Sequence, residues 1–190
     1  MSFAVTGLGR CGTMALARFL NTAPGWTVKH QNDSENHRLG YRLVKHWRRF
    51  SRPNYGEVSC ALLPVLGGLP CKHKAVILRD LKQTALSAAN YSIKVGMGAK
   101  VPLIDELPYT LEMLDAWLQA GATPIYYDRL FSSKESVEHV ARELGIEGPL
   151  TFDIHERHNM GAKKFNSFGE LTPEHQRTVE SCAWFEEMWL

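Results

Sequence analysis

The chain has 190 residues, of which 44% are hydrophobic and 22% charged, and its formal net charge is +2. These values are ordinary for one soluble globular domain, expected to span residues 1–190, and so small a charge does not indicate a nucleic-acid partner. No apolar run reaches the ~20 residues that cross a bilayer, and the first residues lack the basic region and cleavage site of a signal peptide. The sequence therefore predicts a cytoplasmic protein without a membrane span.

Strand-like runs alternate with helical stretches along the chain. Strands are expected at residues 3–7, 26–30, 74–80 and 122–128, and the helices that follow them at 13–21, 36–50, 82–94 and 133–145. A buried helix is expected within 59–70, an amphipathic helix within 104–121, and a last helix with Thr172 as its cap and Pro173 at its first position. This order predicts an α/β fold, a three-layer α/β/α domain with a central, mostly parallel sheet like that of the P-loop NTPases.

The ligands of such sheets bind beyond the carboxyl ends of the strands. The residues that follow Val5, Val28, Leu78 and Tyr126 are therefore expected along one edge. The four cysteines form no CxxC pair and are expected to be reduced thiols. No His, Cys, Asp or Glu cluster has metal-ligand spacing, so no metal is expected.

A glycine-bounded loop, "TGLGRCGT" (residues 6–13), joins the first expected strand to the first helix. Its glycines allow main-chain N–H groups to face an anion, and the N-terminus of the following helix adds the positive end of its dipole. Arg10 and the Thr13 hydroxyl can donate further hydrogen bonds. The G-x4-G spacing of a nucleotide-triphosphate loop is present, but Thr13 and Met14 replace its Lys and Ser/Thr, which disfavours an ordinary kinase or ATPase.

This loop resembles that of the sulfotransferases that use 3′-phosphoadenosine 5′-phosphosulfate (PAPS), roughly G-x-x-[KR]-small-G-T-T, with the basic residue inside the loop. "GLGRCGT" matches with Arg10 as the basic residue, and Met14 stands in place of the second threonine. The resemblance implies that Arg10, Gly12 and Thr13 hold the 5′-phosphosulfate. The expected cofactor-binding residues of the loop are Gly7, Gly9, Arg10, Cys11, Gly12 and Thr13.

A second segment, "RDLKQTALS", resembles the family's strand-ending Arg followed eight residues later by a helical Ser. Arg79 and Ser87 stand at that interval, with Leu81 in place of the usual proline. The resemblance implies that both bind the 3′-phosphate of the cofactor. The alternative for Arg79 is a surface ion pair with Asp80.

Two further segments extend the resemblance towards the C-terminus. "PIYYDRLF" resembles the family's YEDL segment through Tyr127, with Arg129 departing from the pattern, and is expected to be scaffold. "GAKKF" resembles the basic segment that covers the 3′-phosphate, which implies that Lys163 and Lys164 bind there. An exposed surface pair is the alternative for these lysines.

A catalytic base is expected at the same edge of the sheet, because the acceptor must lose its proton during sulfuryl transfer. His30 ends an expected strand, the family places a catalytic His or Glu after the loop, and an imidazole titrates near neutral pH. Glu57, expected in an accessible turn, and Asp33 are the alternatives.

The resulting expectation is a PAPS-dependent sulfotransferase with catalytic residues His30, Arg10 and Glu57. Its acceptor is expected to be a small-molecule or glycan hydroxyl or amine. A small P-loop nucleotide kinase and a non-catalytic nucleotide-binding protein are the alternatives. The aromatic C-terminal helix, with Trp184 and Trp189, is expected to pack on the domain, with a homodimer contact as the other option.

Overall fold

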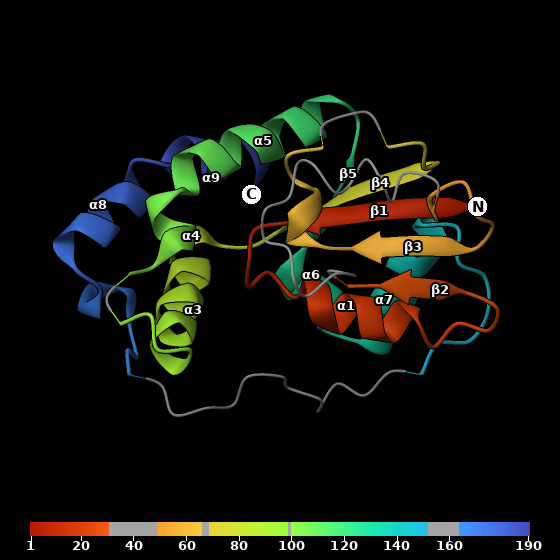
Figure 1. Ribbon diagram of the computed structural model, residues 1–190, viewed down its shortest axis with the longest axis horizontal. Coiled ribbons are helices and arrows are strands. Elements are labelled where there is room, and N and C mark those ends of the chain that lie inside the picture. Colours follow the sequence, from red (N-terminus) through yellow and green to blue (C-terminus); the bar gives the residue numbers. More distant parts are fainter. Residues whose placement is uncertain (31–48, 66–68, 99, 152–163) are drawn as a thin grey trace.

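The computed structural model describes residues 1–30, 49–65, 69–98, 100–151 and 164–190 (Figure 1). The strands are β1 Ser2–Gly7, β2 Thr27–Lys29, β3 Tyr55–Val58, β4 His73–Leu78 and β5 Thr123–Tyr126. The α-helices are α1 Thr13–Leu20, α3 Leu81–Lys94, α4 Pro102–Asp105, α5 Leu107–Gln119, α6 Tyr127–Leu130, α7 Lys134–Glu143, α8 Pro173–Glu180 and α9 Ala183–Trp189. Two short 3₁₀ helices are η2 Cys60–Leu62 and η3 Phe168–Glu170.

The five strands form one sheet in the order β2-β3-β1-β4-β5, and every pair of neighbours is parallel. Their carboxyl ends therefore lie along one edge, which faces left in Figure 1, and their amino ends lie along the other. The all-parallel arrangement agrees with the expected α/β class, because parallel strands need helical crossovers that cover the sheet on both faces.

Alternate residues of the central strands supply two hydrophobic cores. Phe3 and Val5 of β1 pack with α1 and α7 on one face, whereas Ala4, between them, packs with α3 and α5 on the other. Trp117 of α5 is buried in this second core and donates its indole N–H to the carbonyl of Leu63 over 3.1 Å. Figure 1 shows α1, α6 and α7 on one side of the sheet, α5 on the other, and α3 and α8 beyond the carboxyl edge. The three-layer prediction is confirmed.

Several predicted helix starts are also confirmed. Ser133 caps α7 by accepting a hydrogen bond from Ser136 N, and Thr172 caps α8 by accepting one from His175 N. Pro173 occupies the first position of α8. At the C-terminus Phe185 is buried, and Trp189 donates its indole N–H to Asp115 of α5 over 2.9 Å, so α9 packs on the domain.

Three predictions were wrong in part. In place of the buried helix expected within 59–70, the described residues of that stretch form only the short helix η2, which Ser59 caps. The helix expected within 104–121 is two helices, α4 and α5, which meet at Glu106. The turn expected at Gly56 and Glu57 is part of strand β3, which pairs between β1 and β2. The expected helix at 36–50 falls mostly outside the described residues.

Candidate functional site

The glycine loop lies at the carboxyl edge of the sheet, between β1 and α1, where the sequence predicted it. Gly7 closes β1, and a Cβ atom there would lie 2.6 Å from Cys11 Sγ and 2.8 Å from the carbonyl oxygen of Ile77, so only glycine fits. Within the described residues, the main-chain N–H groups of Gly9, Arg10 and Gly12 donate to no protein acceptor. With the N-terminus of α1 directly behind them, these groups are available to an anion.

The backbone of the loop is left-handed at two positions. Gly12 has φ 88° and Arg10, a residue with a side chain, has φ 72°. A Cβ atom at Gly12 would lie 2.7 Å from Phe131 Cε2 and 2.9 Å from Tyr127 Cε2, so two aromatic rings press directly against the loop. A non-glycine residue in this region is strained and is found where the surroundings enforce it, often at a functional site.

The Arg10 guanidinium lies against α3. Its Nε donates to Ser87 Oγ over 3.5 Å, and its Cζ lies 4.6 Å from the centroid of the Tyr91 ring. Burial lowers the pKa of Arg10 from its ordinary value, and the nearby Arg79 cation acts in the same direction. Arginine stays charged despite such a shift, so these contacts hold a permanent cation beside the loop.

Arg79 directly follows β4 and also faces the loop. Its Nη1 donates to the carbonyl oxygen of Arg10 over 2.7 Å, and its Cζ lies 4.2 Å from the centroid of the Tyr127 ring. Its Nε is buried without a hydrogen-bond partner among the described residues. The neighbouring Asp80 caps α3 by accepting from Gln83 N over 2.7 Å. The alternative of an Arg79–Asp80 ion pair finds no support, since neither Arg10 nor Arg79 pairs with a carboxylate in the described part of the chain.

His30 directly follows β2 and reaches the start of α1. Its Nε2 lies 3.2 Å from Thr13 Oγ1, and the two atoms share a hydrogen bond. Burial lowers the pKa of His30, and the positive charge of Arg18 lowers it further. The side chain is half-buried, so at neutral pH it is a neutral imidazole held beside the loop threonine.

The expectation that Glu57 lies in an accessible turn is wrong. Glu57 belongs to β3, is only 5% exposed, and accepts a hydrogen bond from the Tyr55 hydroxyl over 3.2 Å. Its strand ends one residue later, at Val58, so Glu57 stands next to the carboxyl edge of the sheet, but with a buried side chain. The other alternative base, Asp33, lies outside the described residues.

Cys11 contributes its backbone to the loop and packs its side chain inward. The sulfur is fully buried, and burial raises the pKa of its thiol to about 12. A thiol with this pKa is not ionised at neutral pH and is therefore a poor nucleophile.

Of the two lysines expected to bind the 3′-phosphate, Lys163 lies outside the described residues. Lys164 is exposed, and its Nζ lies 5.8 Å from the centroid of the neighbouring Phe165 ring. Its main-chain N–H donates to Asn90 Oδ1 over 2.9 Å, which attaches this segment to α3.

Sequence reasoning missed the aromatic and amide partners of these groups. Tyr91 follows Ser87 by four residues and so lies on the same face of α3, a spacing that could have identified it. Tyr127 was assigned to scaffold, yet its ring contacts both Arg79 and Gly12. Asn90 carried no signal, because the partners that it joins to α3, Lys164 and Phe165, are 74 and 75 residues away.

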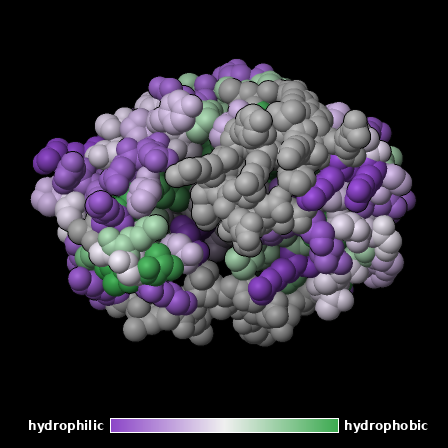
Figure 2. Space-filling view, in the orientation of Figure 1, coloured by the Kyte–Doolittle hydropathy of each residue, from purple (hydrophilic) through white to green (hydrophobic). Residues whose placement is uncertain are grey.

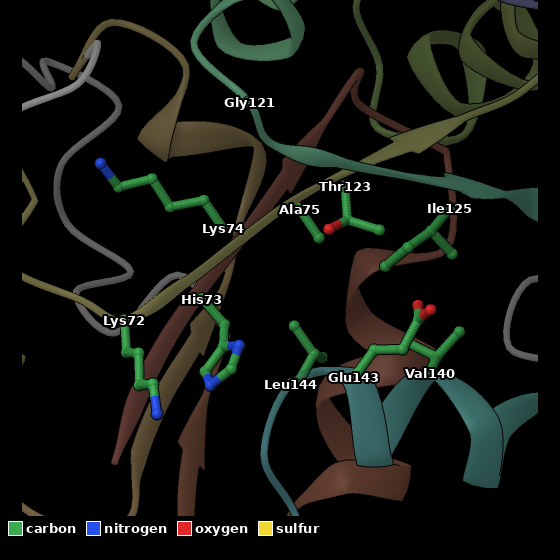
Figure 3. Close-up of a pocket in the computed structure, with 10 residues that line it drawn as sticks. All are labelled: Lys72, His73, Lys74, Ala75, Gly121, Thr123, Ile125, Val140, Glu143 and Leu144. Carbon is green, nitrogen blue, oxygen red and sulfur yellow. The ribbon is translucent and has the colours of Figure 1, made fainter.

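A small cavity of about 120 Å³ lies at the opposite edge of the sheet, between the amino ends of β4 and β5 and the last turn of α7. Figure 3 shows His73, Thr123 and Glu143 around it, with Lys74 directed away. None of the loop residues lines it. The candidate site is therefore the loop edge, where Arg10, Thr13, Arg79 and Ser87 converge.

The described part of the chain offers neither a metal centre nor a membrane-spanning helix. Within the described ranges, no group of three or more His, Cys, Asp or Glu side chains gathers in a way that could hold a metal ion. In the same part of the chain, every helix is too short or too polar to cross a bilayer.

On the face shown in Figure 2, an apolar patch lies near α3 on a largely polar surface. The last turns of this helix and the residues after it expose Tyr91, Val95 and Met97.

Comparison with known proteins connects this geometry to one fold. No protein-family model matches the sequence, and no curated protein sequence matches it either. Among solved structures, the chain is similar to a sulfotransferase from Alicyclobacillus acidocaldarius, with a TM-score of 0.60 and 15% sequence identity. The match covers 97% of this chain and 91% of that one, so the two share a fold over nearly their whole length.

Proposed function

We propose that this chain is a sulfotransferase that moves a sulfuryl group from PAPS to a hydroxyl or amine of a small molecule or glycan. The observation that carries the proposal is the convergence of Arg10 and Arg79, neither paired with a carboxylate among the described residues, on a glycine loop at the carboxyl edge of the sheet. The fold shared with a known sulfotransferase supports it.

The charges of the site suit a ligand with two anionic groups. Arg10 and Arg79 lie close enough for Arg79 to lower the pKa of Arg10, so the site holds two neighbouring cations. An anion between or beside them relieves their repulsion and gains charge-assisted hydrogen bonds. In the proposed complex the loop N–H groups, Arg10 and Thr13 hold the 5′-phosphosulfate, while Ser87, Arg79 and Lys164 serve the 3′-phosphate.

The reaction breaks the bond between sulfur and the bridging oxygen of the 5′-phosphate and forms one between sulfur and the acceptor oxygen or nitrogen. The acceptor proton passes to a base, and the departing phosphate keeps the electron pair of the broken bond. Negative charge therefore builds on the leaving phosphate, where the loop donors and Arg10 stabilise it. His30, hydrogen-bonded to Thr13 beside the same group, is the proposed base.

Titration calorimetry with adenosine 3′,5′-bisphosphate, compared with ATP and Mg²⁺, tests the proposal. We expect the bisphosphate to bind without metal and more tightly than ATP–Mg²⁺. A preference for ATP–Mg²⁺ would favour the kinase, although Asp80, the acidic side chain that follows β4, already caps α3. Bisphosphate binding without transfer of labelled sulfate to any acceptor in a broad panel would favour a non-catalytic nucleotide-binding protein.

Replacing the proposed base separates catalysis from binding. His30→Ala should lower kcat by about 100-fold or more, the usual effect of losing a general base, and leave the bisphosphate Kd within about threefold. His139→Ala is the matched control, because His139 is an exposed imidazole of α7 whose partner is Glu143. Full activity of His30→Ala would remove His30 from the mechanism.

The pH profile gives an independent test of the same role. A base must be unprotonated, and the pKa of His30 is lowered by burial and by Arg18. We therefore expect kcat/KM to be constant above pH ~7 and to fall only below ~6.5, the ordinary pKa of histidine. An acidic limb with its midpoint above ~7 would contradict His30 as the base.

A further inference from the structure

The side chain of Asn90 joins two segments that are far apart in the sequence. Its Oδ1 accepts from the main-chain N–H groups of Lys164, over 2.9 Å, and Phe165, over 3.0 Å. Its Nδ2 donates to the carbonyl oxygens of Phe165, over 3.0 Å, and Leu86, over 3.1 Å. Every donor and acceptor of the amide is thus used, and three of the four bonds reach the segment that begins at Lys164.

This attachment falls on the part of α3 that holds Arg10. Ser87 and Tyr91 both contact the Arg10 guanidinium, and they are one turn apart on the helix. Asn90 follows Ser87 by three residues and precedes Tyr91 directly, so it lies beside the same face. The segment carrying Lys164 is therefore fixed within one helical turn of the residues that position the loop cation.

Lys164 itself is free to meet an anion from this position. Its side chain is exposed, and within the described residues it has no carboxylate partner. Its Nζ lies 5.8 Å from the centroid of the Phe165 ring, a weak interaction at an exposed site. The hydrogen bond that fixes this residue is donated by its main-chain N–H and accepted by Asn90 Oδ1.

We propose that Asn90 is a positioning residue that brings the charge of Lys164 to the anion site on α3. The ligand class is that of the proposed function, on which this inference rests: a nucleotide with a phosphate near Ser87. Asn90 does not touch the ligand, and it acts by holding the backbone of residues 164–165. Removing the Asn90 amide should therefore weaken anion binding by no more than removing the Lys164 side chain does.

A double-mutant cycle on the affinity for adenosine 3′,5′-bisphosphate tests this role. We expect Asn90→Ala and Lys164→Ala each to raise Kd by about three- to tenfold, and the double variant to bind no more weakly than the weaker single variant. Lys94→Ala, which removes an exposed lysine from the last turn of the same helix, should leave Kd within twofold. Additive effects of the two substitutions, or an unchanged Kd in Asn90→Ala, would overturn the inference.

Hydrogen exchange of the Lys164 and Phe165 amides checks the attachment without any ligand. Both amides should be protected in the wild type and exchange at least tenfold faster in Asn90→Ala, while Lys164→Ala retains protection at Phe165. Alanine favours the helix, so Asn90→Ala should fold. If it does not, Asn90→Gln, which moves the amide by one methylene, must show the same loss of amide protection. If the wild type shows protection but binds no bisphosphate, the proposed function fails together with this inference. If the wild type binds bisphosphate and the two substitutions have additive effects on Kd, this inference alone fails.

Discussion

Both edges of the sheet carry positive side chains, but they hold them in different ways. At the carboxyl edge, Arg10 and Arg79 are half-buried, lie over the Tyr91 and Tyr127 rings, and face the N-terminus of α1. At the amino edge, Lys72 is exposed, and the carboxylate of Glu143 lies across the cavity at the C-terminal end of α7. Figure 3 shows this carboxylate directed from α7 towards the side chain of Ile125 on β5.

The direction of the helices explains part of this difference. In a parallel α/β domain, helices begin near the carboxyl edge and end near the amino edge, so the positive ends of their dipoles gather at one edge and the negative ends at the other. An anion at the loop meets free N–H groups, whereas an anion in the amino-edge cavity would meet the last carbonyls of α7 and Glu143. Cationic side chains alone therefore do not identify an anion site.

The largest effect is expected at Gly12, where two aromatic rings pack against the loop backbone. Gly12→Ala adds a Cβ atom at φ 88°, 2.7 Å from the Phe131 ring and 2.9 Å from the Tyr127 ring. We expect a loss of about 2–4 kcal/mol in the free energy of unfolding, from the left-handed backbone and the overlap together. Bisphosphate binding should be lost in calorimetry, because the loop must move away from the rings.

The amino edge offers a matched control for this substitution. Gly25 precedes β2 and has φ 76°, but a Cβ atom there meets nothing within 4 Å. Gly25→Ala should therefore cost only the backbone term, about 1–2 kcal/mol, and leave the bisphosphate Kd unchanged. Equal losses of binding in the two variants would show that stability, and not the loop geometry, controls affinity.

These two edges also differ in how well the sequence predicted them. The carboxyl edge was largely predictable, because the loop, Arg79 and Ser87 are short motifs and the alternation of strands and helices brings them together. Strand β3 was missed because a glycine within "YGEV" and polar neighbours imitate a turn, and its burial depends on β1 and β2 on either side. The contact of Tyr127 with Arg79 and that of Asn90 with Phe165 could not be predicted, since these residues are distant in the sequence and only the folded chain brings them together.

A moderate effect is expected at Arg79, which links β4 to the loop. Arg79→Ala removes both the hydrogen bond to the Arg10 carbonyl and a cation of the site. We expect bisphosphate binding to weaken by about tenfold or more, equivalent to about 1.4 kcal/mol. Arg79→Lys keeps the charge but loses the planar group that lies over Tyr127, so it should recover affinity only in part. An unchanged Kd in Arg79→Ala would remove Arg79 from the site.

The smallest effect is expected at the amino edge, and it tests whether charge there reaches the loop. Strand β4 runs from His73 to Leu78, so Lys72, one residue before it, is separated from the loop edge by about 20 Å at ~3.3 Å per residue. The Debye length is about 8 Å at physiological ionic strength, so the field of an exposed lysine is largely screened over that distance. Lys72→Ala should therefore leave the bisphosphate Kd within about twofold of the wild type in calorimetry, although it removes the same formal charge as Arg79→Ala. A tenfold loss would mean that the amino edge binds the nucleotide, and the assignment of the site to the loop edge would then be wrong.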